Sequence, residues 1–228
     1  MSQFPKNLRA VIFDLDGTLV DTAEEFVQVV NAMRDEDNLE PLPEAIIRAN
    51  VSNGSGALVT LAYGIEKDHR DFSTQRQRLL DKYSTIIGDS ARPYPGITDL
   101  LQDLQNRGIN WGIATNKPRA YTEPLLAALA FEPAPLSVTC PDDVTQGKPH
   151  PEALLLNLKQ MQCLPHEAVY VGDHLRDIQA GRGAGLYTIA ATYGYIEDHD
   201  DPATWRANAY AHCSTELAAL LSIKEQFI

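Results

Sequence analysis

The sequence has few cysteines and no long hydrophobic run. Its three cysteines, Cys140, Cys163 and Cys213, are far apart and form no CxxC pair. This spacing argues against a disulfide framework or a zinc site and indicates reduced thiols. The longest apolar runs are too short to span a bilayer, and Asp14 interrupts the only apolar stretch near the amino terminus. We therefore expect a cytoplasmic protein with no membrane partner.

Basic residues are also scarce. The 228 residues include 19 lysines and arginines against 31 aspartates and glutamates, which gives a net charge of −12. Nucleic acids and anionic membranes are bound by basic surfaces, so this balance argues against both as partners. An anionic small molecule is compatible with it if a metal ion or a single lysine supplies local positive charge. The sequence does not distinguish a monomer from a homodimer.

Strand-like apolar runs alternate with helix-like segments through much of the chain. We expect strands at Ala10–Asp14, Ile109–Thr115, Leu136–Cys140, Ala168–Asp173 and Tyr187–Ala191. Helices are expected between the later strands, at Ile97–Arg107, Arg119–Ala130, Pro151–Met161 and Leu175–Arg182. This alternation indicates right-handed βαβ units, and it predicts an α/β fold with a Rossmann-like parallel sheet.

The segment 21–90 interrupts this alternation. It is polar and helix-prone, and the turn-forming SNGSG at 52–56 is expected to separate two of its helices. The prolines and glycine of ARPYPG at 91–96 are typical of a linker back to the sheet. We therefore predict an α/β core formed by 1–20 and 91–228, with an α-helical domain formed by 21–90 inserted after the first strand.

Polar residues follow the strands that would face a common crevice. Ligands of open parallel sheets bind at the carboxyl ends of the strands, so these residues predict a site. Asp14 and Asp16 follow the first strand, and an extended chain would point both carboxylates to one side. The later strands are followed by Thr115 and Asn116 in GIATNKP, Lys148 in DDVTQGKPHP, and Gly172, Asp173 and Asp177 in VYVGDHLRD.

These residue types suit phosphoryl transfer. Four clustered carboxylates repel one another, and Mg²⁺ is the cation that best relieves such repulsion. Lys148 would add one fixed positive charge, while the hydroxyl of Thr115 and the amide of Asn116 suit phosphoryl oxygens. One carboxylate can attack phosphorus and form an aspartyl phosphate, and a second can act as general acid and base. The four carboxylates expected to cluster are those of Asp14, Asp16, Asp173 and Asp177.

The motifs DLDGTLVDT, ATNKP, GKPHP and VGDHLRD, in this order, resemble the four motifs of the haloacid dehalogenase superfamily. The resemblance covers the whole chain, and the helical insert is similar to that superfamily's cap. It implies that Asp14 is the nucleophile and that Asp16 is the general acid and base. It also implies that Asp14, the backbone carbonyl of Asp16, and Asp173 bind Mg²⁺.

The resemblance assigns the remaining motif residues to the phosphoryl group and its surroundings. Thr115, Asn116 and Lys148 would hold that group, while Asp177 and Gly172 would have supporting roles. His174 departs from the usual residue after Asp173, and its role stays open. In the cap, the loop RANVSNGSG is expected to face the substrate through three residues, Ser52, Asn53 and Gly54.

Two branches of the superfamily resemble this chain most. The ATNKP motif is similar to that of the phosphoglycolate phosphatases. The stretches CPDDV, KPHPEALLL, GDHLRDIQAGRGAG and YGYIEDHDDPATW resemble the N-acetylmuramic acid 6-phosphate phosphatases, a branch involved in cell wall recycling. The resemblance implies a Mg²⁺-dependent phosphomonoesterase for a small phosphate ester, with the muramate ester favoured over phosphoglycolate.

Two other functions use similar motifs or a similar pocket. A sugar-phosphate mutase has the same four motifs, and it would depend on a sugar bisphosphate. A regulatory module could accept phosphate on an aspartate without turnover, although an inserted cap argues against an open pocket of that kind. The aromatic residues Tyr193, Tyr195 and Trp205 are expected to pack in the protein more than to contact a ligand.

Overall fold

A six-stranded sheet forms the centre of the computed structural model, which describes residues 3–222. The strands lie in the order β5-β4-β1-β6-β7-β8, and every neighbouring pair is parallel. This confirms the predicted α/β fold with a Rossmann-like parallel sheet. The strands are β1 (Ala10–Phe13), β4 (Asn110–Ala114), β5 (Ser137–Thr139), β6 (Ala168–Gly172), β7 (Tyr187–Ala191) and β8 (Ala209–Ala211).

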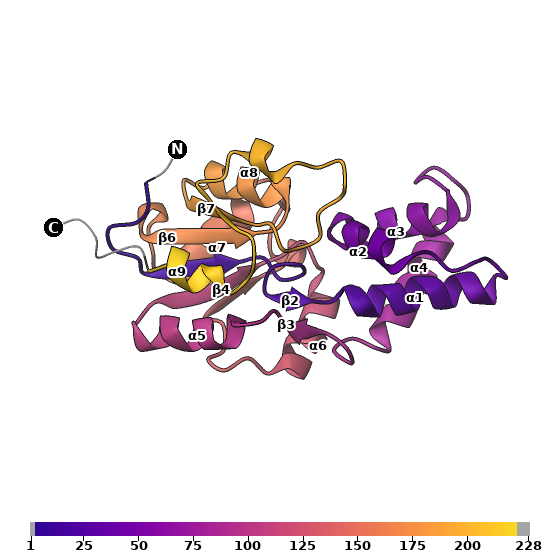
Figure 1. Ribbon diagram of the computed structural model, residues 1–228, viewed down its shortest axis with the longest axis horizontal. Coiled ribbons are helices and arrows are strands. Elements are labelled where there is room, and N and C mark those ends of the chain that lie inside the picture. The colour runs from indigo at the N-terminus through magenta and orange to yellow at the C-terminus, as the bar shows by residue number, and fades with distance from the viewer. Residues whose placement is uncertain (1–2, 223–228) are drawn as a thin grey trace.

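Helices cover both faces of the sheet (Figure 1). One face carries α5 (Ile97–Asn106), α6 (Arg119–Leu129) and α9 (Glu216–Leu220), and the other carries α7 (Glu152–Gln160) and α8 (Leu175–Gly183). Side chains of β1 alternate between the two layers, since Val11 and Phe13 face α5 while Ala10 and Ile12 face α7. Both layers are apolar, which explains why every residue of β1 is buried.

The predicted strands and helices of this half agree with the observed ones to within one residue at either end. The sequence does not predict β8, α9 or the two-stranded pair of β2 (Val20–Asp21) and β3 (Arg92–Pro93). Each of these elements has five residues or fewer, which is too short for a periodic pattern to be recognised.

Four helices lie together beside the sheet (Figure 1). They surround a separate apolar cluster that includes Phe26, Leu58 and Leu79. The turn predicted at 52–56 is shorter than expected, because α3 already begins at Gly54, whose φ is 82°. The helices are α1 (Ala23–Glu36), α2 (Glu44–Asn50), α3 (Gly54–Tyr63) and α4 (Phe72–Ser84).

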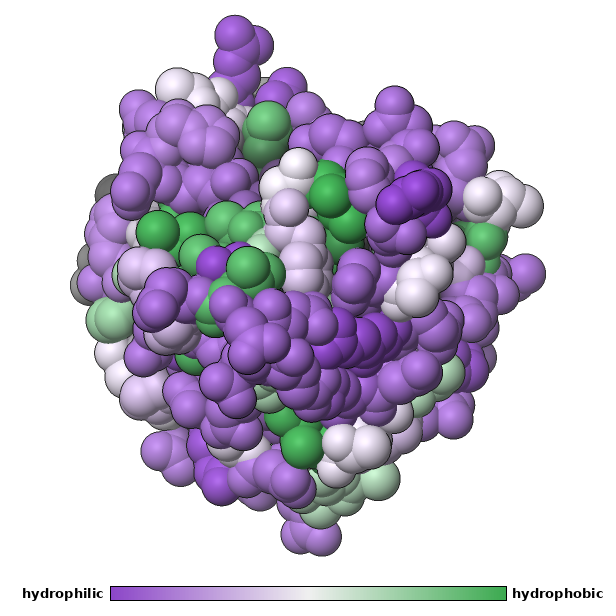
Figure 2. Space-filling view, turned by 90° about the vertical axis from the view of Figure 1, so that its right-hand side faces the viewer, coloured by the Kyte–Doolittle hydropathy of each residue, from purple (hydrophilic) through white to green (hydrophobic). Residues whose placement is uncertain are grey.

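We call these helices and their loops the cap. The pairing of Val20 with Pro93 joins the two chain segments that lead into and out of it. The exact division into 1–20 with 91–228 and 21–90 stays a prediction, and residues 1–2 and 223–228 of the predicted core lie outside the described ones. Viewed from the cap side, the surface is mainly hydrophilic, with hydrophobic residues in separate small areas (Figure 2). No helix within residues 3–222 is long and apolar enough to cross a membrane.

Glu25 fastens the returning chain to the first cap helix. Its side chain is fully buried, and Oε1 accepts hydrogen bonds from the backbone N–H groups of Gly88 at 2.8 Å, Ser90 at 3.3 Å and Ala91 at 3.1 Å. Burial raises the pKa of this carboxyl, although the three N–H donors oppose the rise. Glu25 therefore fixes the segment that re-enters the sheet domain.

We predict that Glu25→Ala lowers the free energy of unfolding by about 2–4 kcal/mol, because three N–H groups lose their acceptor. Glu25→Gln keeps an acceptor oxygen in the same place, so we expect a loss of less than about 1 kcal/mol. Urea unfolding followed by circular dichroism measures both. Equal losses in the two variants would contradict the assigned role of Oε1.

Candidate active site

The predicted site residues converge at the carboxyl end of β1. This strand lies between β4 and β6, so the chain connections diverge on either side of it, at the topological switch point of the sheet. Asp14, Thr115 and Asp173 are the first residues after β1, β4 and β6 respectively. The arrangement of three neighbouring parallel strands therefore brings together side chains that are up to 159 positions apart.

Three carboxylates and one ammonium form the centre of this site. One oxygen from each of Asp14, Asp173 and Asp177 lies within 4.8 Å of the others. Lys148 Nζ is 2.8 Å from Asp14 Oδ1 and 2.7 Å from Asp177 Oδ1, and the lysine side chain is 1% exposed. The Tyr170 hydroxyl donates a further hydrogen bond to Asp177, at 2.9 Å. Within residues 3–222, Lys148 is thus the one ammonium that pairs with these three buried carboxylates.

Burial dominates the electrostatics of this cluster. It raises the pKa of Asp14 to about 6 despite the opposing effect of Lys148. Burial, together with the negative charges of Asp14 and Asp177, raises the pKa of Asp173 to about 8. Burial works against the charge of Lys148, but the carboxylates hold its pKa above the usual value. The cluster therefore favours additional positive charge, either a proton or a cation.

Close packing positions Asp173. Its carboxylate accepts hydrogen bonds from Thr18 Oγ1 at 3.1 Å, Ser52 Oγ at 3.0 Å and the Tyr195 backbone N–H at 3.0 Å. A Cβ atom at Gly17, whose φ is 79°, would collide with this carboxylate. Glycine is therefore required at position 17 both for its backbone conformation and for space.

Gly172 and Asp177 also fit closely. A Cβ atom at Gly172 would collide with the Asp177 side chain, and Asp177 Oδ2 accepts the backbone N–H of His174 at 3.0 Å. His174 is the N-cap of α8, where its Nδ1 accepts the backbone N–H of Arg176 at 3.2 Å. Burial lowers the pKa of the His174 imidazole. The open role of His174 is thus filled by helix capping.

The carboxylate of Asp16 is not part of the acidic cluster, which corrects the prediction of four clustered carboxylates. Its Oδ1 accepts hydrogen bonds from Thr22 Oγ1 at 2.7 Å and Lys117 Nζ at 3.0 Å. The strand ends at Phe13, and the chain then turns through Gly17, so the two-residue alternation of an extended strand does not apply. The predicted metal contact of Asp16 involves its backbone carbonyl and stays a prediction.

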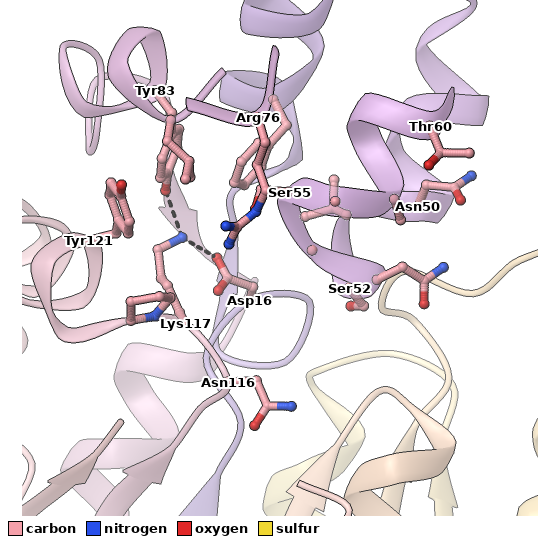
Figure 3. Close-up of a pocket in the computed structure, with 18 of the residues that line it drawn as sticks. Asp16, Asn50, Ser52, Ser55, Thr60, Arg76, Tyr83, Asn116, Lys117 and Tyr121 are labelled. Atoms are coloured by element: carbon pink, nitrogen blue, oxygen red, sulfur yellow. Dashed lines mark hydrogen bonds and ion pairs between the residues drawn. The ribbon is translucent and has the colours of Figure 1, made fainter. Parts of the chain in front are cut away.

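Lys117 also follows β4, and sequence reasoning assigned it no role although it contacts Asp16. Its Nζ also donates to the hydroxyl of Tyr83 on α4, at 2.7 Å, and lies 4.7 Å from the centroid of that ring (Figure 3). Burial opposes its charge, but Asp16 and Tyr83 raise the pKa of the ammonium. The signal was present, because a second, partly buried acid two positions after Asp14 favours a basic partner, and Lys117 directly follows Asn116 in the second motif.

Thr115 and Asn116 hold the neighbouring loops. Thr115 Oγ1 accepts the backbone N–H of Lys117 at 3.0 Å. The Asn116 amide forms two 3.0 Å hydrogen bonds with the backbone of Lys148, one as donor and one as acceptor. These contacts orient both lysines, whereas the predicted contact of Thr115 and Asn116 with a phosphoryl group stays a prediction.

A cavity of about 940 Å³ lies between the cap and the carboxyl ends of the strands. Eight predicted site residues line it: Asp14, Asp16, Ser52, Asn53, Gly54, Thr115, Asn116 and Lys148. Gly172, Asp173 and Asp177 are not among the described residues that line it. The cap also contributes an apolar wall that includes Phe26, Phe72, Leu80 and Tyr83.

The predicted cap loop also contacts the sheet domain. Ser52 donates to Asp173 as described above, and its backbone carbonyl accepts a hydrogen bond from Arg176. Asn53 Nδ2 donates to Glu197 Oε2 at 2.9 Å, and its Oδ1 is 3.3 Å from His174 Nε2. These contacts hold the cap loop against the loops that follow β6 and β7.

The aromatic residues at the end of the fifth predicted strand pack in the protein. Tyr195 is 4% exposed and Trp205 is 2% exposed. The Tyr195 hydroxyl accepts the backbone N–H of Thr22 at 2.6 Å and donates to Asp21 at 2.8 Å, while the Tyr193 hydroxyl donates to the backbone carbonyl of Thr18 at 2.8 Å. The packing role expected from the sequence is confirmed.

Comparison with known proteins agrees with this geometry. The family model described as haloacid dehalogenase-like hydrolase matches residues 11–191. The chain belongs to this family. The resemblance recognised in the four motifs is thereby confirmed.

Individual relatives of this haloacid dehalogenase-like hydrolase cover nearly the whole chain. It is 41% identical over 214 residues to the N-acetylmuramic acid 6-phosphate phosphatase of Pseudomonas aeruginosa, across 94% of this chain and 95% of that protein. It is 36% identical over 203 residues to the phosphoglycolate phosphatase of Xanthomonas campestris pv. campestris, across 88% and 90% of the two chains. The crystal structure of a predicted phosphoglycolate phosphatase from Haemophilus somnus has a TM-score of 0.82 at 23% identity, covering 93% and 97%, which shows a shared fold.

We predict that the acidic cluster makes thermal stability depend on pH and on Mg²⁺. Asp14 and Asp173 bind protons more tightly in the folded chain than in the unfolded chain, so without Mg²⁺ their contribution to stability is lost as pH rises through about 6 and about 8. Added MgCl₂ should raise Tm, and more at pH 8 than at pH 6, because it replaces those protons.

Scanning calorimetry at pH 6, 7 and 8, with and without MgCl₂, measures this effect. Asp173→Asn should lose most of the stabilisation by Mg²⁺, since the amide carries no negative charge. The exposed variant Asp68→Asn serves as its control. A Tm independent of Mg²⁺ at pH 8 would contradict a metal site in this cluster.

Proposed function

We propose that this protein is a Mg²⁺-dependent phosphomonoesterase that hydrolyses N-acetylmuramic acid 6-phosphate through an aspartyl-phosphate intermediate. The observation that carries the proposal is a cavity beneath the cap whose lining includes Asp14, Asp16 and Lys148. A nucleophile, an acid and a cation for the phosphoryl group thus meet in one place. The names of the relatives at 41% and 36% identity support the same reaction class.

Asp14 is assigned as the nucleophile. The two described hydrogen-bond or ion-pair contacts of its carboxylate, with the Leu15 backbone N–H at 2.7 Å and with Lys148 Nζ at 2.8 Å, both involve Oδ1. We therefore assign the attack on phosphorus to Oδ2. A bond forms between this oxygen and phosphorus as the bond between phosphorus and the sugar oxygen breaks, and the charge of Lys148 stabilises the phosphoryl oxygens.

Asp16 is assigned as the general acid and base. In its acid form it gives a proton to the departing sugar oxygen, and the resulting carboxylate then accepts a proton from the water that attacks the aspartyl phosphate. Phosphate leaves, and the Asp14 carboxylate is regenerated. Lys117 and Thr22 hold the Asp16 side chain in place through the whole cycle.

Thr115 and Asn116 complete the assigned phosphoryl site together with Lys148. Asp177 acts on the site through Lys148, which it contacts at 2.7 Å. Gly172 has an indirect role, because its lack of a side chain leaves the space that Asp177 occupies. These roles follow from the family resemblance, and the observed contacts of Thr115, Asn116, Asp177 and Gly172 are consistent with them.

The residues of the acidic cluster fit a magnesium ion. The ion would be held by the carboxylates of Asp14 and Asp173 and by the backbone carbonyl of Asp16. The closeness of the carboxylate oxygens, which lie within 4.8 Å of one another, supports this assignment, and burial, which raises the pKa of both Asp14 and Asp173, makes a bound cation more favourable. When bound, Mg²⁺ supplies positive charge to the phosphoryl oxygens.

The size of the cavity favours a sugar phosphate over phosphoglycolate. About 940 Å³ is near the upper end of the range of roughly 300–1,000 Å³ for small-molecule sites, and a two-carbon acid needs far less. The lining combines an apolar wall with amide and hydroxyl groups, which suits a sugar ring. Phosphoglycolate is the second candidate, supported by the relative from Xanthomonas campestris.

We further propose that the protein is cytoplasmic and is a monomer or a homodimer.

We expect kcat/KM with Mg²⁺ to be higher for N-acetylmuramic acid 6-phosphate than for 2-phosphoglycolate, by at least about tenfold, because the smaller ester leaves cap contacts unmade. Release of inorganic phosphate by the purified protein measures both values. A preference for 2-phosphoglycolate would reject the muramate assignment and retain the phosphatase reaction.

Two variants test the assigned roles of the aspartates. Asp14→Asn should abolish turnover, because a neutral amide does not replace the attacking carboxylate. Asp16→Asn should lower kcat by roughly 10²–10⁴, or about 3–5 kcal/mol in the barrier, since the proton donor is lost. Asp68→Asn is the matched surface control. Near-wild-type rates in either site variant would refute the role assigned to that residue.

A further inference from the structure

We propose that Arg76, on cap helix α4, binds the carboxylate of the substrate and thereby determines which sugar phosphate is accepted. This inference rests on the proposed function. It goes beyond the four motifs, because Arg76 lies outside all of them. It assigns the cap a binding role for a second anionic group, separate from the phosphoryl group.

The cavity has an excess of positive charge in a strongly acidic protein. Its described lining contains five basic residues, Lys67, Arg76, Lys117, Lys148 and Arg176, and three acidic ones, Asp14, Asp16 and Glu66. Ion pairs join Lys148 to Asp14 and Lys117 to Asp16. The positive charge that remains on the cap side is suited to an anion, although the net charge of the whole chain is −12.

Arg76 differs from nearby basic residues of the cap in the group that its side chain contacts. Arg48, Arg78 and Lys82 each form an ion pair with a carboxylate at 2.5–2.6 Å. Arg76 has no such ion pair among the described residues. Its Nε donates to Ser55 Oγ at 2.9 Å, so the side chain is held by a neutral group that leaves its charge uncompensated.

The guanidinium of Arg76 points into the cavity (Figure 3). Because the contact with Ser55 involves Nε, the two terminal nitrogens are left to bind a ligand. A planar pair of N–H donors matches a carboxylate in two parallel hydrogen bonds. Phe72 and Leu80, which also come from α4 and line the cavity, offer an apolar surface beside it for a sugar ring.

The chemistry of the proposed substrate supplies the partner. N-acetylmuramic acid carries a lactyl ether that ends in a carboxylate, and N-acetylglucosamine is the same sugar without that ether. The 6-phosphates of the two sugars therefore differ only in the lactyl ether, which carries the carboxylate that Arg76 is proposed to bind. An analogue without this carboxylate loses the two hydrogen bonds to the guanidinium, so it should bind more weakly, although Arg76 is exposed and water solvates its charge when no ligand is bound.

Steady-state kinetics with these two 6-phosphates test the proposal. We expect the wild type to prefer the muramate ester, and Arg76→Gln to reduce the ratio of the two kcat/KM values by about 2- to 10-fold, mainly through KM for the muramate ester, because Arg76 is exposed. Arg76→Lys keeps the charge and should retain part of the preference. Arg70→Gln, at an 89% exposed arginine of the cap, is the control and should retain all of it.

Three results would overturn the inference. If the wild type did not distinguish the two esters, no carboxylate would be recognised. Equal losses for both esters in Arg76→Gln would instead place Arg76 on the phosphoryl group or in the cap fold. If the wild type hydrolysed neither ester, the proposed function itself would fail, and that result is distinguishable because it does not involve the variant.

Discussion

The buried ammonium of Lys148 is the contact on which the rest of the site depends. It lies between Asp14 and Asp177, and without it the three close carboxylates at the end of β1 would form no ion pair with any of the residues that the structure describes. Breaking a buried ion pair by removing one partner typically costs about 3–5 kcal/mol, because an unpaired charge is left behind. Lys148 is in turn held through its backbone by Asn116, so two motifs are locked together.

The two aspartates of the first motif pair with different lysines. Asp14 faces Lys148 and the acidic cluster, whereas Asp16 faces Lys117 and Thr22. Two carboxylates that are two positions apart thereby acquire different surroundings, which suits the different roles proposed for them. Since Lys117 also contacts Tyr83 of α4, the position of the cap is linked to the assigned acid.

The fold and the list of strand-end residues were largely predictable from the sequence. Apolar runs such as 10–13 mark buried strands, and the rule that ligands lie at their carboxyl ends identifies Asp14, Thr115 and Asp173. The rule says where a side chain begins and not where it points. The separation of Asp16 from the cluster and the contact of Lys117 with Tyr83 were therefore missed, because both depend on how the chain turns after a strand.

The sequence by itself determined the α/β fold, the inserted helices and the chemical types gathered at the site, because periodicity, turn residues and charge are local properties of the chain. Tertiary structure decided which lysine pairs with which aspartate. It also decided the hydrogen bonds that Ser52 and Asn53 of the cap loop make with the sheet domain, and the shape of the cavity into which Arg76 points. These features arise from contacts among the loops at the carboxyl ends of the strands and from the position of the cap beside them. Contacts between segments so far apart in the chain leave no periodic signal in either segment.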